Sequence, residues 1–185
     1  MRKGMSLLEA IVSSAILAVL FSVSAVTLIT SQKVMKREES KREGILIAFS
    51  VAQSFLASPF QSLPPEEKQL LEEKQLLEEQ KAIISFPASK FENLFVTDEQ
   101  GKILDAKVED DGKTVSVREQ NLGKVFIHYD AVFLEKGWKI KVKGEFITEE
   151  LKPSMKPTNL KLLTITAEKG DVSCPPLKVI VGRRR

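Results

Sequence analysis

The sequence predicts an α+β fold in which one long N-terminal helix packs on a small antiparallel β-sheet. Two observations carry this prediction. Residues 5–58 contain no proline, and residues 91–185 consist of short runs with a period of two, separated by turn residues. The chain has 185 residues, 43% of them hydrophobic and 29% charged. That is enough for one globular domain in addition to an apolar segment.

Residues 5–30 are predicted to form the transmembrane half of the helix. This stretch of 26 residues carries a single charge, Glu9. At 1.5 Å per residue it spans roughly 39 Å, more than the roughly 30 Å of a bilayer's hydrocarbon core. Arg2 and Lys3 precede it, and basic residues stay on the cytoplasmic side of a membrane. We therefore expect a cytoplasmic N-terminus and an extracytoplasmic C-terminal domain.

Residues 31–58 predict the amphipathic half of the same helix. A densely charged segment at 36–43 is followed by apolar residues at spacings of three and four, which indicate one apolar helix face. We expect this face to pack on the chain's own globular domain. The face consists of Ile45, Ala48, Phe49, Ala52, Phe55 and Leu56. Gly44 is a place where the helix can bend. Pro59 ends the helix, because the residue before a proline disfavours helical geometry.

Residues 59–90 predict a connection that contains a short charged helix over 66–81. The hexapeptide Glu-Glu-Lys-Gln-Leu-Leu occurs at 66–71 and again at 72–77. Pro64 and Pro65 precede it, as at many helix starts, and acids fill the first turn. A period of six builds no continuous stripe, so no coiled coil is predicted. We expect a surface helix, with a partner-binding helix as the alternative.

Residues 91–185 predict an antiparallel sheet of four to six strands. Asp-Gly at the centre of 110–113 and the segment 135–137 indicate hairpin turns. Residues 152–158 contain two prolines and predict a loop. Apolar Trp138, Ile140 and Val142 alternate with lysines, which is typical of a strand with one buried face. The predicted strands are 102–109, 114–118, 124–134, 138–148, 160–168 and 177–181.

The residues offer little chemistry, and no enzyme is predicted. His128 is the only histidine, lies on a predicted strand and has no nucleophile motif near it, so it is interpreted as a core or surface residue. Cys174 is the only cysteine, which excludes an internal disulfide and indicates a small buried or half-buried thiol. No metal site and no cofactor are expected, since the acids of 98–111 fit no EF-hand spacing.

The charge balance does not indicate nucleic acid. The formal net charge is +3, and removal of Arg2 and Lys3 with a leader would leave the chain near neutral. The three arginines at 183–185 are interpreted as a solvated tail, with docking onto an acidic partner as the alternative.

The segment Gly4-Met5-Ser6-Leu7-Leu8-Glu9, inside Met-Arg-Lys-Gly-Met-Ser-Leu-Leu-Glu-Ala-Ile-Val, resembles the N-terminus of type IV pilin-like proteins. That group includes pilins, minor pilins, competence pseudopilins and the pseudopilins of type II secretion. In it, a prepilin peptidase cuts after the glycine on the cytoplasmic side and methylates the new amine. The resemblance implies that residues 1–4 are a leader peptide, that Gly4 and Met5 flank the cleavage site, that Met5 is N-methylated and that Glu9 serves subunit assembly.

The resemblance also implies a function and partners. The chain would be a minor pilin or pseudopilin of the inner membrane, incorporated through its helix into a type IV pilus-like or type II secretion filament. Its partners would be the peptidase, other subunits, the inner-membrane assembly platform and membrane lipid. Most pilins carry phenylalanine where Met5 stands, and major pilins usually have a late proline that residues 5–30 lack. These departures favour a minor subunit.

Two alternatives remain open. Residues 1–25 could be a secretory signal peptide cleaved after Val23-Ser24-Ala25, although Glu9 weakens an apolar signal region. Residues 5–30 could also be a plain single-pass anchor. Both alternatives give an extracytoplasmic binding domain that forms no filament. The sequence does not choose among pilus, competence and secretion systems.

Overall fold

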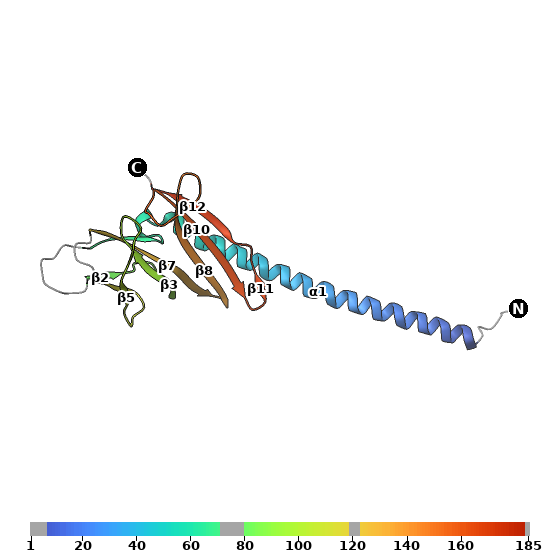
Figure 1. The fold of residues 1–185 in the computed structure, drawn as a ribbon. Coiled ribbons are helices and arrows are strands. Elements are labelled where there is room, and N and C mark those ends of the chain that lie inside the picture. Colours follow the sequence, from blue (N-terminus) through green and yellow to red (C-terminus); the bar gives the residue numbers. More distant parts are fainter. Residues whose placement is uncertain (1–6, 71–79, 119–122, 184–185) are drawn as a thin grey trace. The chain divides into compact units, whose positions relative to one another are not determined.

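The computed structural model describes residues 7–70, 80–118 and 123–183. The chain forms two units, Met1–Arg42 and Glu43–Arg185. The described part of the first unit is helical and belongs to α1 (Leu7–Ala57). The second unit holds the remaining turns of α1 and the antiparallel β-sheets, so the predicted α+β class is confirmed (Figure 1).

Helix α1 follows the prediction closely at its C-terminal end. It ends at Ala57, two residues before Pro59, and the Ser58 amide donates to the Phe55 carbonyl at 3.0 Å. A short 3₁₀ turn, η1 (Phe60–Ser62), follows. The helix continues through Gly44, where the sequence allows a bend. Gly44 instead lets the helix lie close to the side chains of Trp138 and Cys174.

The described residues form a nine-stranded main sheet and a three-stranded second sheet, more than the four to six strands predicted. All pairings are antiparallel. The main path runs β11-β10-β8-β7-β3-β4, with β1 on β7, β12 on β10 and β9 on β8; the second sheet runs β2-β6-β5. The main-sheet strands are β1 (Glu66–Gln69), β3 (Lys90–Thr97), β4 (Ile103–Leu104), β7 (Lys124–Glu135), β8 (Trp138–Ile147), β9 (Pro153–Ser154), β10 (Leu160–Lys169), β11 (Val172–Ser173) and β12 (Leu177–Gly182). The second sheet contains β2 (Gln80–Ile83), β5 (Ala106–Val108) and β6 (Thr114–Val117).

Both predicted hairpins are present. β7 and β8 are joined by Lys136 and Gly137, whose φ angles of 50° and 79° match the two-residue turn that suits a twisted hairpin. Between β5 and β6, the carboxylate of Asp111 accepts the amides of Lys113 and Thr114 at 2.8 and 2.7 Å. The turn chemistry read from the sequence therefore holds in both places.

The helix predicted over residues 66–81 is wrong where the structure describes it. Residues 66–69 form β1, residues 80–83 form β2, and residues 71–79 lie outside the described residues. β1 pairs with β7, and the Glu66 carboxylate is buried, where it meets the Lys68 ammonium at 2.8 Å and accepts the Ser85 amide at 3.0 Å. These long-range contacts outweigh the local helix propensity of the repeat.

The main sheet forks at Gly144. β7 pairs with β8 as far as Asp130 opposite Lys143, and beyond that point β1 pairs with β7 in its place, with Glu66 opposite Ile127. Gly144 lies directly against the Pro64 carbonyl, so a side chain at this position would collide with the entering chain. The separated end of β8 is covered by β9, a two-residue strand within the predicted loop 152–158.

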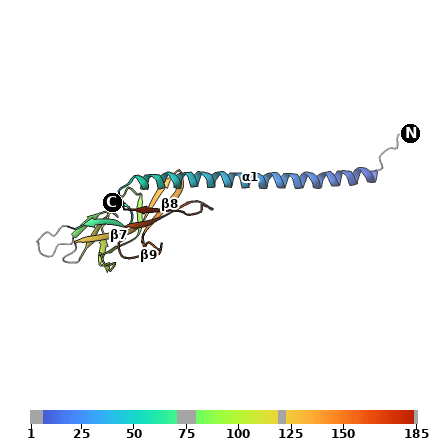
Figure 2. The same ribbon diagram turned by 90° about the horizontal axis from the view of Figure 1, so that it is seen from above.

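The last turns of α1 cover one side of the sheet, and β9 lies on the other side (Figure 2). Phe55 is 1% exposed and stacks on Phe86 at 4.8 Å. The predicted apolar face is confirmed for Ala48, Ala52 and Phe55, which are buried together with Ile47. It is wrong for Ile45, Phe49 and Leu56, which are exposed. The buried line is rotated because Gly44 and Ile47, rather than Ile45, face the sheet.

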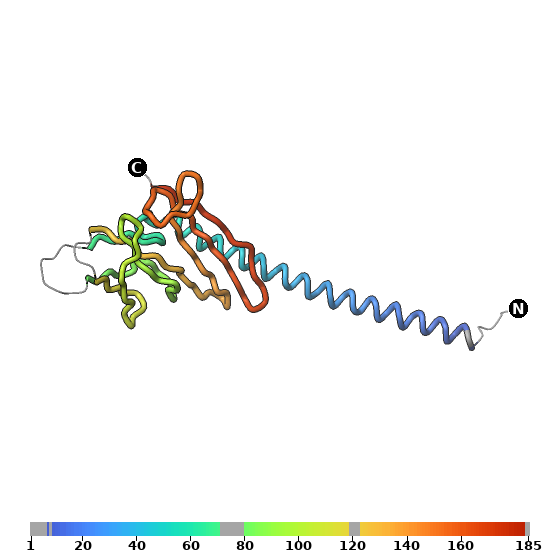
Figure 3. Tube along the Cα trace, viewed as in Figure 1, coloured from blue at the N-terminus to red at the C-terminus, as the bar shows by residue number. Residues whose placement is uncertain are grey.

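A buried lysine fixes the connection between α1 and β1, whose path Figure 3 traces. Lys161 on β10 is 1% exposed, and its ammonium donates to the carbonyls of Phe60, Leu63 and Pro65 at 2.7, 2.9 and 2.7 Å. Burial lowers the pKa of Lys161 to about 7, against the opposing charge of Glu67. Three carbonyl acceptors match the three donors of an ammonium group, so the protonated form satisfies all of them.

Candidate functional site

The N-terminal half of α1 exposes apolar side chains on all its faces. Leu7 is 81% exposed, and large apolar residues stay exposed along the described turns: Ile11, Val12, Ile16, Leu17, Val19, Leu20, Phe21, Val23, Val26, Leu28 and Ile29. The helix is long and apolar enough to cross a membrane, although a signal sequence near an N-terminus meets the same criteria. A helix that is apolar all round needs either protein or lipid around it.

Five hydroxyl groups in this half are satisfied by the helix itself. Each donates to a carbonyl three or four residues earlier at 2.8 Å: Ser14, Ser22, Ser24, Thr27 and Thr30. In hydrocarbon, where no water is at hand, an unsatisfied hydroxyl costs free energy. These five hydroxyl groups therefore do not require an aqueous neighbour.

Glu9 lies in the first turn of α1 as an exposed carboxylate beside Leu7 and Ile11. The positive end of the helix dipole favours an acid at this place. Gly4 and Met5, the other two predicted site residues, lie outside the described residues. Of these three residues, the structure therefore describes Glu9, whose carboxylate lies on an apolar helix.

The charged segment 36–43 separates the apolar half of α1 from the turns that pack on the sheet. Within it, the Lys41 ammonium donates to the Glu38 carboxylate at 2.9 Å. The hydrogen bond from Lys41 and its charge lower the pKa of the Glu38 carboxyl. Such exposed pairs contribute little to stability. These charged side chains give the helix a solvated surface C-terminal to the apolar stretch.

Within the second unit, α1 is held by a close contact with Trp138. A Cβ on Gly44 would lie 2.5 Å from the Trp138 ring and 2.6 Å from the Cys174 sulfur, so only glycine permits this approach. The predicted buried thiol at Cys174 is confirmed. The Trp138 indole donates to the Glu43 carboxylate at 3.3 Å, and the Lys169 ammonium lies 3.5 Å from the same carboxylate.

The electrostatics of this contact are consistent with its geometry. The indole hydrogen bond, followed by the charge of Lys169, lowers the pKa of the Glu43 carboxyl. The Lys169 ammonium also lies 5.6 Å from the centre of the Trp138 ring, within cation–π range. Sequence reasoning missed Glu43 and Lys169 as partners of Trp138, because no local pattern links residues so far apart. Gly44, singled out only as a bend, was the one available signal.

Beside the buried face, about 100° further round the helix, α1 carries an exposed apolar strip, here named the outer helix face: Ile45, Phe49 and Leu56. At 100° per residue, these three side chains lie within a narrow arc. Exposed apolar residues gathered on one side of an element are typical of a contact surface.

The histidine and the acidic residues that the sequence analysis considered as possible sites make structural contacts. His128 is buried, bonds to the Thr97 hydroxyl at 3.0 Å and stacks on Phe95 at 4.4 Å; burial lowers its pKa to about 4. Asp98 accepts two turn amides. Among the described residues, no three His, Cys, Asp or Glu side chains cluster in a way that could hold a metal ion.

The predicted solvated tail is corrected in part. Arg183 is not free in solvent: its guanidinium lies 2.6 Å from the Glu67 carboxylate, and its amide donates to the Asn159 carbonyl at 2.8 Å. Arg184 and Arg185 lie outside the described residues.

No protein-family model, no curated protein and no solved structure matches the chain. The function is therefore inferred from the chain's own residues.

Proposed function

We propose that the chain is a minor pilin or pseudopilin, cut after Gly4 by a prepilin peptidase, methylated at Met5 and built into a type IV pilus-like or type II secretion filament through α1. The observation that carries this proposal is Glu9. It is the single charge in the apolar stretch 5–30, and it follows the Gly4-Met5 junction at the spacing of the pilin-like motif.

The physical case begins with the cost of that charge. A carboxylate inside a bilayer costs roughly 2.5–3.5 kcal/mol at mid-helix and less towards the interface. Cleavage after Gly4 would create a cationic amine on Met5. If neighbouring helices stagger, the amine of one subunit meets Glu9 of the next, and two unfavourable charges become a pair. Such a pair favours assembly and sets the register between subunits.

The two parts of α1 support separate tasks in this proposal. The apolar half would anchor the subunit in the inner membrane before assembly and line the filament core after it, with the N-terminus cytoplasmic and residues 43–185 extracytoplasmic. The docked half would carry the globular unit, and the outer helix face would contact neighbouring subunits. The self-satisfied hydroxyls of the apolar half suit both lipid and a dry filament core.

The test is the substitution Glu9→Ala, with Glu38→Ala as the matched control in the same helix. Glu9→Ala should leave cleavage intact and reduce the amount of subunit in sheared filaments at least about tenfold, since 1.4 kcal/mol corresponds to a factor of ten. Glu38 lies in the charged segment, so its substitution should leave incorporation unchanged. Normal incorporation of the Glu9→Ala subunit would remove the assembly role of this carboxylate.

A single-pass anchor and a cleaved signal peptide are the competing functions, and both give a binding domain outside a filament. In either case neither variant would appear in filaments, whether or not Glu9 is present. The amount of wild-type chain in the sheared filament fraction is therefore measured first.

A further inference from the structure

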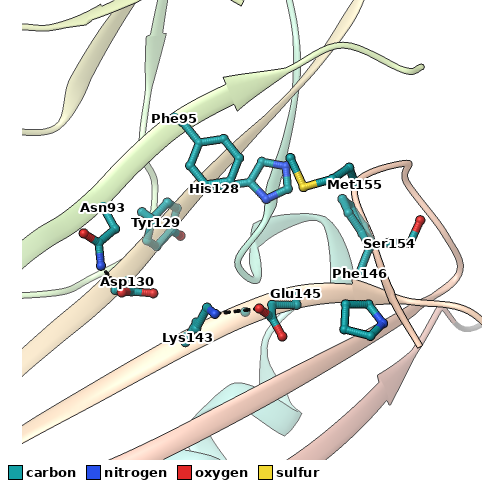
Figure 4. Close-up of a pocket in the computed structure, with 12 residues that line it drawn as sticks. Asn93, Phe95, His128, Tyr129, Asp130, Lys143, Glu145, Phe146, Ser154 and Met155 are labelled. Carbon is teal, nitrogen blue, oxygen red and sulfur yellow. Dashed lines mark hydrogen bonds and ion pairs between the residues drawn. The ribbon is translucent and has the colours of Figure 1, made fainter. Parts of the chain in front are cut away.

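The sheet fork at Gly144 opens a cavity of about 360 Å³ on the side of the sheet opposite α1. This volume lies within the range of small-molecule sites, roughly 300–1,000 Å³. Figure 4 shows side chains from β3, β7, β8 and the β9 segment converging on it. The lining residues are Asn93, Phe95, His128, Tyr129, Asp130, Lys143, Gly144, Glu145, Phe146, Pro153, Ser154 and Met155.

Asn93, which has an unusual backbone conformation, forms part of one wall of the cavity. Asn93 has a φ angle of 52° at a bulge in β3, where the pairing with β7 shifts. Its amide nitrogen donates to Oδ2 of Asp130 at 2.7 Å, so its carbonyl oxygen is left as an acceptor. Bulges and residues with positive φ occur often beside binding sites, because they re-aim a side chain.

Asp130 is a buried carboxylate in the wall of the cavity. It is 4% exposed, and both of its contacts, with Asn93 and with the Lys141 ammonium at 2.9 Å, use Oδ2. The hydrogen bond to Asp130 raises the pKa of Lys141. Oδ1 takes part in neither contact. It is not among the fully buried atoms that lack a partner, so it stays open to a hydrogen-bond donor.

The charged groups of the cavity are already balanced. The Lys143 ammonium pairs with the Glu145 carboxylate at 2.6 Å, and Lys141 pairs with Asp130. Burial lowers the pKa of His128 to about 4, so this ring is neutral near pH 7. An anion would meet two carboxylates, and a cation would have to displace a lysine. A neutral ligand requires neither change.

The other wall is apolar and aromatic. The rings of Phe95 and His128 stack at 4.4 Å, and the Phe146 ring meets His128 edge to face at 6.1 Å. The thioether of Met155 completes this wall, and the Ser154 hydroxyl lies beside it. Phe146 is 1% exposed and His128 is 6% exposed, so the accessible apolar surface of this wall comes from Phe95 and Met155. An apolar wall opposite a polar wall suits a ligand that has both an apolar face and hydroxyl groups.

We propose that this cavity binds a neutral saccharide. The hydroxyl groups of a pyranose both donate and accept, so they can satisfy Oδ1 of Asp130 and the Asn93 carbonyl, and can accept from Lys143. The C–H groups of the ring pack against the accessible surface of Phe95 and the Met155 thioether. The site involves no residue of the N-terminal half of α1, so its function is separate from filament assembly.

The test uses the isotope-labelled full chain in detergent micelles, titrated in the millimolar range. The probes are the methyl β-glycosides of glucose, galactose and N-acetylglucosamine, with ethylguanidinium as the cationic comparison. At least one glycoside should give saturable amide shifts centred on Phe95, Gly144 and Met155, and ethylguanidinium should give none. Saturation by ethylguanidinium alone, or by no probe, overturns the proposal.

Two variants and two controls define the site. Asn93→Gly keeps a positive φ accessible and removes the amide, so it should weaken glycoside binding about fivefold, the equivalent of one hydrogen bond of about 1 kcal/mol. Lys136→Gly, another positive-φ position outside the cavity, should leave it unchanged.

Glu145→Gln removes a charge but keeps a hydrogen-bonding group, so glycoside affinity should stay within about twofold, because less than 0.5 kcal/mol is at stake. Glu168→Gln, an exposed carboxylate outside this cavity, is its control. Equal binding by the Asn93→Gly and Lys136→Gly chains would show that the glycoside does not occupy this cavity.

Discussion

The two halves of α1 both carry large apolar side chains but differ in their surroundings. Up to Thr30 the described large apolar side chains are exposed on every side of the helix, whereas from Gly44 onward the helix buries one line of residues against the sheet. The first half has one carboxylate, Glu9, in an apolar stretch; the second has Glu43, which is held by an indole and an ammonium.

The difference shows what each half needs from outside the chain. Trp138 and its neighbours supply the docked half with partners from the same molecule. In the proposed filament, neighbouring subunits would surround the first half. Stability of the globular unit and assembly of the subunit should therefore respond to different substitutions. Trp138, the single tryptophan, is buried and reports unfolding of the docked half.

The largest effect on stability is expected from a matched pair on the docked half. Phe55→Ala should lower the free energy of unfolding by about 3–5 kcal/mol, since Phe55 is 1% exposed and stacked. Phe49→Ala removes the same atoms from a residue that is 52% exposed and should cost less than about 0.5 kcal/mol. Urea unfolding followed by Trp138 fluorescence measures both. Equal losses would mean that the two faces of α1 have been assigned wrongly.

A loss of about 3–4 kcal/mol is expected for Lys161→Met. The substitution leaves three buried carbonyl oxygens, on Phe60, Leu63 and Pro65, without their donor. Lys143→Met, on the exposed side of β8, is the control and should change stability by less than about 1 kcal/mol. A Lys161→Met chain as stable as the wild type would show that the ammonium does not hold the connection after α1.

Acid should weaken the globular unit through His128. The folded pKa of about 4 lies below the ordinary value of 6.5, so the unfolded chain binds the proton more tightly between these two pH values. The free energy of unfolding should therefore fall as pH drops from 6.5 to 4, by up to about 3 kcal/mol at 1.36 kcal/mol per unit.

The control for this acid effect is His128→Gln, which can keep the bond to Thr97 but does not titrate. Its unfolding free energy should fall less over the same window when both chains are measured by urea titration at a series of pH values. Parallel curves for the two chains would exclude His128 as the cause.

The smallest effect sharpens the contact between α1 and the sheet. Gly44→Ala raises helix propensity by about 1 kcal/mol, yet its Cβ would lie 2.5 Å from the buried Trp138 ring. Overpacking costs about 1–3 kcal/mol, so a net loss of up to about 2 kcal/mol is expected. Ser50→Ala, on the exposed side of the same helix, should be neutral. A more stable Gly44→Ala chain would show that Trp138 can move away from the helix.

The parts of the fold that local patterns determine were predictable. The helix end before Pro59, the β7–β8 alternation and the turn at Asp111 depend on neighbouring residues, and the sequence carries them directly. Glu9 was found in the same way, as a charge in an apolar run. The motif around Gly4 is also local, although its residues lie outside the described part of the chain.

The parts that depend on distant partners were not predictable. Glu66 sits in a segment that favours a helix, and only its pairing with β7 and the buried bonds of its carboxylate make it a strand residue. Phe49 and Phe55 look alike in a helical pattern, and which one is buried depends on where Gly44 meets Trp138. The cavity joins Asn93, Asp130 and Glu145 through strand register and a fork, which no spacing in the sequence encodes.

The mass of the N-terminal peptide of the mature protein tests the central claim most directly. The chain is purified from membranes, digested and analysed by mass spectrometry. The proposal predicts a peptide that begins at Met5 and carries one methyl group on its amine. A chain that begins near Val26, as after signal-peptide cleavage, or that retains residues 1–4, as in an uncut anchor, would contradict it.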